Sequence, residues 1–386
     1  MTNGVMGISL IAGSIAALHA AWWLLLALLA LRCPSRRLPS PHGLRIAVVV
    51  PAHNESACIG RTLASLLAAE GSRASAILVV ADNCSDDTAA VARTFGVTVL
   101  ERNEPTVRGK SHALDFALAY LRSLQIPPEA VAFVDADSTV SGNFLARAGG
   151  RIGDGAKVVQ VHYAVAPGES SLVRLRRLAF ALAHWARPLG ASRLGLGTTL
   201  KGNGMVLRWE LVQDGFAGAG LAEDAAMTLA LARRGIAVDF EPRATVWGEM
   251  AATYRQATVQ DQRWEAGRFS LMSRALLIAL RAAIRLRFRA AAGALEVASL
   301  PLTVVGLLAL VPMAAVATGS LPASLAVSPL AVLGASVLTG WLAARVSRTD
   351  LAALITAPRF LAHKLRVLAT LSLHRGPREW QRTARD

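Results

Sequence analysis

Two carboxylates end a short apolar run in this chain. Asp135 and Asp137, separated by one alanine, follow directly after residues 131–134. Like charges this close repel each other unless a cation relieves the repulsion. One interpretation is a solvated turn, because Asp and Ser favour turns. The other is a divalent metal site, because carboxylate oxygens are the hard ligands that Mg²⁺ and Mn²⁺ prefer.

Polar side chains follow two further apolar runs. The runs 46–50 and 76–80 lead into His53, Asn54, Glu55, Asp82 and Asn83. Each group taken alone fits ordinary loop polarity. Three such groups after three apolar runs need a common explanation, and that explanation depends on the elements that carry them.

The apolar runs alternate with helical patterns. The predicted strands are 46–50, 76–80, 97–100 and 131–134, and the predicted helices are 59–69, 86–95 and 109–124. This alternation indicates βαβ units, so the sequence predicts an α/β domain with a mainly parallel sheet. Ligands of such sheets bind beyond the carboxyl ends of the strands. The polar groups are therefore expected at one rim, where carboxylates and amides suit the ribose and base of a sugar nucleotide and a metal suits its diphosphate.

A cationic segment, RGKSHAL at 108–114, opens the third predicted helix. Lys110 lies near the helix N-terminus, where backbone N–H groups and the helix dipole favour anions. A contact with the diphosphate is expected, and a solvated loop is the alternative.

The chain resembles the membrane-bound family 2 glycosyltransferases in an ordered set of motifs: PAHNE, ADNCSDDT, VRGKSHALDFAL, VDAD, AEDAAMTLALARRG and QDQRW. The resemblance covers about residues 44–270. The wording of the second and third motifs is most similar to bacterial exopolysaccharide glycosyltransferases of the methanolan type. Cellulose, hyaluronan and chitin synthases are more distant members of the superfamily. The resemblance implies a Rossmann-like GT-A fold and inversion at the anomeric carbon.

The resemblance also implies roles at the donor end. Asp82 would contact the nucleotide, and Asp135 and Asp137 match the DxD motif of the family, with Asp137 as the direct metal ligand. The metal is Mg²⁺ or Mn²⁺. The full set of expected donor-nucleotide residues is His53, Asn54, Glu55, Asp82, Lys110 and Asp135.

A second pair of acids opens the segment 220–235. Glu223 and Asp224 match the (T/S)ED motif of the family, in which the Asp is the catalytic base. This chain has Ala222 in place of the hydroxyl residue, which puts a local capping bond in doubt. Favourable charges at a helix N-terminus are the alternative interpretation. The resemblance implies that Asp224 accepts the proton of the attacking hydroxyl.

A third motif follows in the segment QDQRW. Gln260, Arg263 and Trp264 match QxxRW, and their spacing places them on one face of a helix. A surface Arg–Trp stack is the alternative. The resemblance implies a role at the acceptor and the diphosphate, shared with Glu223 and with Asn203 of the segment 200–208.

Uncharged segments flank the predicted domain. Residues 1–31 and 297–344 contain no Lys, Arg, Asp or Glu. The first is long enough for one membrane crossing and the second for two. Basic residues follow the first and last crossings, which predicts an outer N-terminus and a cytoplasmic catalytic domain. The expected localisation is the bacterial inner membrane.

Arginine-rich helical patterns lie beside these segments, at 170–194 and after residue 269. They are typical of helices on an anionic membrane surface. The expected divisions are a transmembrane helix (1–31), a cytoplasmic GT-A domain (32–268) with an interfacial helix near 170–194, an interfacial helix (269–296), two transmembrane helices (297–344) and a basic cytoplasmic tail (345–386).

The expected reaction moves one sugar from a nucleotide-sugar, a UDP-sugar by expectation, to a lipid-linked acceptor such as a polyprenyl-diphosphate oligosaccharide in exopolysaccharide synthesis. The alternatives are transfer to a ceramide-like or hopanoid-like lipid, processive polysaccharide synthesis, and an inactive membrane scaffold. The net charge of +15 also fits nucleic acid. Three crossings exclude nucleic acid as the main partner.

Overall fold

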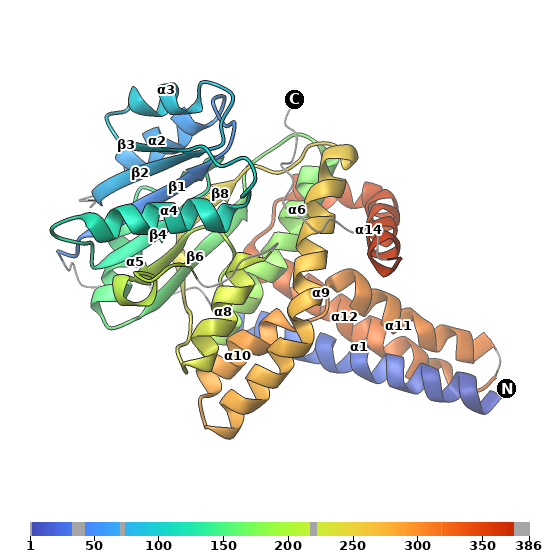
Figure 1. Ribbon diagram of the computed structural model, residues 1–386. Coiled ribbons are helices and arrows are strands. Elements are labelled where there is room, and N and C mark those ends of the chain that lie inside the picture. Colours follow the sequence, from blue (N-terminus) through green and yellow to red (C-terminus); the bar gives the residue numbers. More distant parts are fainter. Residues whose placement is uncertain (1, 33–42, 70–73, 217–221, 318, 374–386) are drawn as a thin grey trace.

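The computed structural model describes residues 2–32, 43–69, 74–216, 222–317 and 319–373. Within them, an α/β unit adjoins a bundle of apolar helices that points away from the sheet (Figure 1). The strands are β1 (Ile46–Ala52), β2 (Ala74–Asp82), β3 (Thr98–Arg102), β4 (Ala130–Phe133), β5 (Ser138–Val140), β6 (Val158–Val165), β7 (Met205–Arg208) and β8 (Asp239–Gly248).

The helices of the α/β unit are α2 (Ile59–Leu67), α3 (Thr88–Arg93), α4 (Lys110–Ser123), α5 (Phe144–Gly153) and α8 (Glu223–Arg233). A second group lies between this unit and the apolar bundle: α6 (Ser171–Phe180), the π-helical turn η1 (Ala181–Ala186), α7 (Arg187–Arg193), α9 (Tyr254–Ile284), α10 (Phe288–Val297), α13 (Arg348–Ala352) and α14 (Ala357–Ser372). The apolar bundle contains α1 (Thr2–Ala30), α11 (Leu302–Ala317) and α12 (Ala323–Ala344).

The sheet has the strand order β3-β2-β1-β4-β7-β6-β8-β5. The first four strands are parallel, so their carboxyl ends lie at one edge. The remaining strands are mixed: β7 is antiparallel to β4 and β6, β8 is parallel to β6, and β5 is antiparallel to β8. The predicted α/β fold is confirmed, and all four predicted strands and three predicted helices are present within a few residues of their expected bounds.

Two apolar layers cover the faces of the sheet. Successive residues of a strand point to opposite faces, so Val48 and Val50 enter the layer beneath α2 and α5, whereas Val49 enters the layer beneath α4. All three valines have no exposed surface. A sheet buried on both faces needs strands that are apolar throughout, which is what the predicted runs show.

The uncharged segments form the apolar bundle of α1, α11 and α12. Two described stretches are long and apolar enough to span a membrane, Met6–Ala30 and Ala323–Ala344. A third candidate is a bent pair, because α10 and α11 meet at 76° across a short break. Pro301 lies in that break, where proline cannot continue a helix. The segment 297–344 contains the two helices α11 and α12; α11 has 16 residues, about 24 Å of helix, and reaches membrane-spanning length only together with α10.

The arginine-rich pattern after residue 269 does not form a separate helix. It continues α9, which has 31 residues and also carries the QxxRW motif, and α10 begins after a break at Arg285–Arg287. Beyond the motif, α9 leaves Leu276, Leu280 and Ile284 exposed. The described residues do not include Arg36 and Arg37, the basic residues after the first predicted crossing, or the tail from residue 374.

Candidate active site

A cavity of about 490 Å³ connects the carboxyl edge of the sheet with the apolar bundle. Its donor end, as we call it, lies after β1, β2 and β4 and is lined by Pro51, Ala52, His53, Glu55, Asp82, Lys110, Asp135 and Asp137. Its membrane end lies among α1, α11 and α12 and is lined by Trp23, Leu302, Thr303, Ser336, Val337 and Gly340. The parallel strands β2, β1 and β4 are neighbours, which is why their loops meet at one place.

Lys110 connects the acids of the donor end. Its ammonium group donates to the Asp135 carboxylate and the Gly202 carbonyl and lies 3.7 Å from Glu223 Oε1. Burial disfavours the charge, but the carboxylates of Asp135 and Glu223 hold the pKa of Lys110 above its ordinary value. Burial raises the pKa of Asp135 above its ordinary value, Lys110 opposes this and Asp137 adds to it. Asp135 therefore lies between one fixed cation, Lys110, and the like charge of Asp137, whose repulsion is only partly relieved.

Asp82 is held rigidly at the end of β2. Its Oδ1 lies 2.6 Å from Arg102 Nη1 and accepts from Asn83 Nδ2 at 2.9 Å. His53 Nδ1 makes a 2.6 Å hydrogen bond with the Asp82 carbonyl, which joins the loops after β1 and β2. His53 and Asp82 both line the cavity, as the sequence predicted.

Two predicted site residues do not line the cavity. The Asn54 amide exchanges hydrogen bonds with Ser85 and holds a backbone with φ 56°. Asn203 is fully buried: its Oδ1 accepts from the backbone N–H of Asp135 at 3.1 Å and its Nδ2 donates to Ser138 Oγ at 2.8 Å. Both side chains fix loops around the acids, so the structure does not bring Asn54 or Asn203 into the cavity lining with the other predicted residues.

Asp224 is the second residue of α8 and lines the cavity. Burial raises its pKa above the ordinary value, which the backbone N–H of Ala225, Lys110 and Lys201 partly oppose. The backbone approaches closely here: a Cβ at Gly202, whose φ is 80°, would lie 3.4 Å from Asp224 Oδ2. Glu223 precedes it, and burial raises its pKa as well. A carboxylate with a raised pKa is a stronger proton acceptor, which suits a general base.

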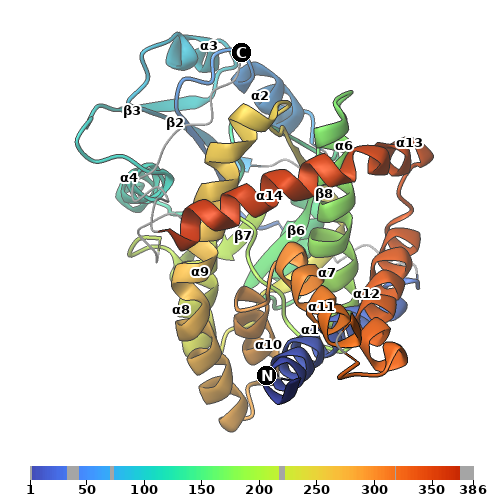
Figure 2. The same ribbon diagram turned by 90° about the vertical axis from the view of Figure 1, so that its right-hand side faces the viewer.

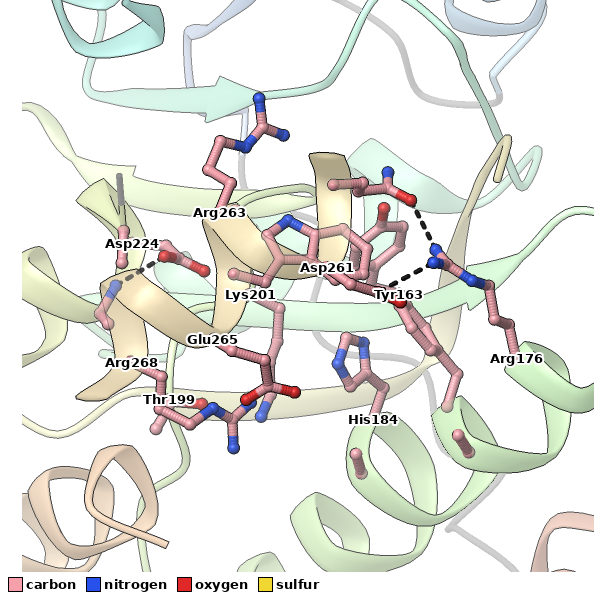
Figure 3. Close-up of a pocket in the computed structure, with 18 of the residues that line it drawn as sticks. Tyr163, Arg176, His184, Thr199, Lys201, Asp224, Asp261, Arg263, Glu265 and Arg268 are labelled. Atoms are coloured by element: carbon pink, nitrogen blue, oxygen red, sulfur yellow. Dashed lines mark hydrogen bonds and ion pairs between the residues drawn. The ribbon is translucent and has the colours of Figure 1, made fainter. Parts of the chain in front are cut away.

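The QxxRW residues lie together on α9 and line the cavity. Arg176 of α6 donates to the Gln260 amide oxygen, and its guanidinium carbon is 5.7 Å from the centre of the Trp264 ring. Figure 3 shows Arg263 extending from α9. Glu223 and Asp135 are among the charges that act on it. The predicted grouping of this motif with the acids therefore agrees with the geometry.

Divalent metal fits this site only with a bound phosphate. Among the described residues, no group of three His, Cys, Asp or Glu side chains is placed to hold a metal ion. Asp135 and Asp137 supply two carboxylates, one of which already pairs with Lys110. Mg²⁺ commonly takes one or two carboxylates and completes its shell with substrate phosphates and water. The donor set agrees with that arrangement.

The sequence matches the family described as "Glycosyltransferase like family 2" over residues 41–283, more than half of the chain. The chain belongs to glycosyltransferase-like family 2. This family 2 chain is 24% identical over 237 residues to the probable glycosyltransferase YdaM of Bacillus subtilis, which is 58% of this chain and 55% of that protein. It therefore spans about half the length of that curated relative.

Solved structures agree with the fold of this family 2 chain. The mannosyltransferase PcManGT from Pyrobaculum calidifontis, in complex with GDP-Man and Mn²⁺, has a TM-score of 0.58 and 20% identity, over 95% of this chain and 98% of that one. This likeness confirms the predicted GT-A fold. Glucosyl-3-phosphoglycerate synthase from Mycobacterium tuberculosis, with Mg²⁺ and UDP, has 23% identity and a TM-score of 0.42 over 56% of this chain and 75% of that one, too low for further conclusions.

The cavity of the family 2 chain also contains charged residues that the sequence did not identify. Arg176 and Arg187 belong to the arginine-rich pattern at 170–194, which predicted a membrane-surface helix. Their side chains are only 4% and 14% exposed and line the cavity. Lys201 and Arg268 join them from a loop and from α9. The arginines of this helix therefore do not all face outward, and amphipathic spacing alone could not separate inward from outward arginines.

Proposed function

We propose that the chain is an inverting glycosyltransferase that moves one sugar from a nucleoside diphosphate sugar, a UDP-sugar by expectation, to a lipid-linked acceptor in the bacterial inner membrane. One observation carries the proposal: a single cavity runs from the acids of the sheet to helices of membrane-spanning length. Such a cavity brings a water-soluble donor and a membrane-borne acceptor to the same carboxylate.

The chemistry follows from the positions of the acids. The acceptor hydroxyl loses its proton to Asp224 as its oxygen attacks the anomeric carbon from the face opposite the diphosphate, so the configuration inverts. The raised pKa of Asp224 favours this transfer. Lys110 and Arg263 place positive charge beside the diphosphate on which negative charge develops.

The proposed cofactor is Mg²⁺ or Mn²⁺. Asp137 and Asp135 would hold it together with the donor's diphosphate. A bound divalent cation neutralises charge on the leaving diphosphate. PcManGT was solved with Mn²⁺ and GDP-Man, which supports the same requirement here.

The proposed membrane contact rests on the exposed surface of α9 as well as on the length of the apolar helices. Beyond the spans, α9 and the following break expose apolar side chains next to arginines, namely Leu276, Leu277, Leu280, Ile284, Leu286 and Phe288 beside Arg274, Arg281, Arg285, Arg287 and Arg289. Groups of exposed apolar side chains mark interaction surfaces, and arginines beside them favour an anionic leaflet. We place the α/β unit on the cytoplasmic side and the N-terminus outside, by the charge flanks of the spans.

The lining of the membrane end supports addition of one sugar per acceptor. Among the described lining residues there, Thr303 and Ser336 are the hydroxyl groups, and the rest are apolar or aromatic. A threaded glycan presents several hydroxyl groups per sugar, each of which needs a partner. A lipid chain needs none. Exopolysaccharide synthesis of the methanolan type is the proposed pathway.

The test measures transfer of a radiolabelled sugar to lipid. Purified full chain in nanodiscs, given each of several radiolabelled nucleotide-sugars, Mn²⁺ and a bacterial lipid extract, should move label from one of them into the organic phase. The product should have the anomeric configuration opposite to that of the donor. Retention of configuration, or label that moves only into water-soluble products, would refute the proposal.

A further inference from the structure

The middle of the cavity, between Asp224 and the membrane end, is lined by cations. We call Arg187 of α7, Lys201 and Arg268 of α9 the cation cluster, and it faces Glu296 of α10. Figure 3 shows Lys201 and Arg268 reaching the same part of the cavity from different elements. Glu296 Oε1 lies 3.6 Å from Arg187 Nη1 and 4.0 Å from Lys201 Nζ. One carboxylate oxygen is thus shared between two cations at long distances.

The next carboxylate of the lining, Glu265, offsets the cluster in part, because its Oε2 is buried and makes no hydrogen bond within the described part of the chain. Its Oε1 lies 3.5 Å from Lys364 of α14, which also lies 3.3 Å from Asp261 Oδ1. Arg268 Nη1 reaches only a backbone carbonyl, that of Ser299, at 3.5 Å. Between Asp224 and the membrane end, three cations, Arg187, Lys201 and Arg268, thus face two carboxylates, Glu296 and Glu265. Uncompensated buried charge is unfavourable unless a ligand completes it.

Several buried polar atoms of this region also make no hydrogen bond within the described part of the chain. They are Arg187 Nε, His184 Nδ1 and Trp23 Nε1, and all three residues line the cavity. The Arg187 guanidinium lies 5.0 Å from the centre of the Trp23 ring, so the cluster touches the first apolar helix. Native proteins satisfy about nine in ten buried polar groups. A ligand with several acceptor oxygens would satisfy these.

The charges around Lys201 favour an anionic ligand at the cluster. Burial lowers the pKa of Lys201 to about 8; Glu296 opposes this, and Arg187 and Arg268 lower it further. The pKa of His184 is also held well below its ordinary value, first by burial and then by Lys201 and Arg187. His184 is thus neutral, and the surplus charge of the cluster is positive.

We propose, on the basis of the function proposed above, that the cation cluster binds the phosphate or diphosphate that links the acceptor's sugar to its lipid chain. Lys201 directly precedes Gly202, which lies against the Asp224 carboxylate, so the cluster begins beside the base. Beyond the cluster the lining becomes apolar at Trp23 and Leu302. A sugar at Asp224, a phosphate at the cluster and a lipid chain at the membrane end match this order. A neutral lipid of the ceramide type would leave the cluster without an anion.

The test is binding without donor. Full-length chain in detergent, with EDTA and no nucleotide, is titrated calorimetrically with farnesyl diphosphate, farnesol and inorganic pyrophosphate. Farnesyl diphosphate should bind at least tenfold more tightly than either other probe. Arg187→Gln and Arg268→Gln should each weaken its binding at least tenfold. The matched control Arg233→Gln, an exposed arginine of α8 outside the cavity, should not.

Each contrary result has a definite meaning. Farnesol that binds as tightly as farnesyl diphosphate, or cluster variants that bind like Arg233→Gln, would overturn the proposal. Pyrophosphate that binds as tightly would overturn the lipid source and indicate free phosphate. Binding of UDP or GDP with Mn²⁺ verifies that each variant is folded. A chain that glycosylates a neutral lipid but ignores farnesyl diphosphate refutes this inference and leaves the proposed function standing.

Discussion

Arg176 Nη2 lies 2.8 Å from Asp261 Oδ1, and this buried ion pair joins α6 to α9 at the wall of the cavity. The other oxygen of Asp261 makes a 2.9 Å hydrogen bond with His363 Nε2 of α14. Figure 2 shows α14 lying across α9 toward α6. Arg176 also holds the Gln260 side chain and packs near Trp264. One carboxylate therefore connects three helices and indirectly orients the QxxRW motif.

The first prediction concerns this ion pair. Asp261→Asn leaves Arg176 buried without a full counter-charge, so we expect a loss of stability on the order of 3–5 kcal/mol and a lower melting temperature in detergent. The control Glu101→Gln, in the exposed pair with Arg93, should cost at most about 1 kcal/mol. His363 and Arg176 hold the pKa of Asp261 at about 2 in spite of burial, so its contribution is present above its ordinary pKa and is lost as pH falls toward 2. Equal melting temperatures for the two variants would show that the pair is not structural.

The second prediction concerns the base. Asp224→Asn should keep nucleoside diphosphate binding and lower turnover by roughly a hundredfold or more, the scale of general-base contributions. The wild-type rate should rise with pH through a pKa above the ordinary value for Asp, because only the ionised carboxylate accepts a proton. Asp214→Asn, an exposed matched change, should alter neither. Parallel loss of binding and rate would instead assign Asp224 to the donor.

The third prediction concerns the metal. Since only two carboxylates are placed for it, Mn²⁺ alone should bind weakly and should bind strongly once UDP or GDP is present. Asp137→Ala should abolish that enhancement. Calorimetric titration of Mn²⁺ with and without nucleotide measures both effects. Full activity in excess EDTA would rule the requirement out.

The fourth prediction concerns Lys201. Its neighbours are Arg187, Arg268, Glu296 and Asp224, and its pKa is held at about 8. Only the protonated amine attracts an anion, so farnesyl diphosphate binding should weaken as pH rises through about 8. Phosphate groups have lost their last proton above about pH 7, so they do not obscure the change. Lys201→Arg should bind at high pH as well as at low pH, and an unchanged pH profile in that variant would contradict the assignment.

The sequence predicted the first half of the α/β unit well. Its strands are continuous apolar runs such as 46–50, and parallel pairing brings their carboxyl ends together. The sequence alone therefore places Asp82, Asp135 and Asp137 at one rim. The strands after β4 were not predicted, because the sequence pattern does not show how mixed strands pair. Their order depends on long-range pairing between β6, β7 and β8.

Contacts between distant segments explain the remaining differences. The amides of Asn54 and Asn203 look like ligand groups in a motif, but Asn54 accepts from the backbone of Ser85 and Asn203 accepts from the backbone of Asp135. Arg176 and Arg187 look like headgroup-binding arginines, because helical spacing does not show that the face on which they lie is covered by α9 and α10. Burial of a charged group is decided by its tertiary partner, and the partners Asp261 and Glu296 lie 85 and 109 residues away.

The most direct test of the account is the mass of the lipid product. Wild-type chain in nanodiscs is incubated with its nucleotide-sugar in excess and with a prenyl-diphosphate-linked sugar, and the lipid fraction is analysed by mass spectrometry over a time course. The account predicts that the acceptor gains the mass of one sugar and stops there, and that Asp224→Asn yields none of this product. A ladder of products many sugars long, or an acceptor of unchanged mass while the donor is consumed, would contradict it.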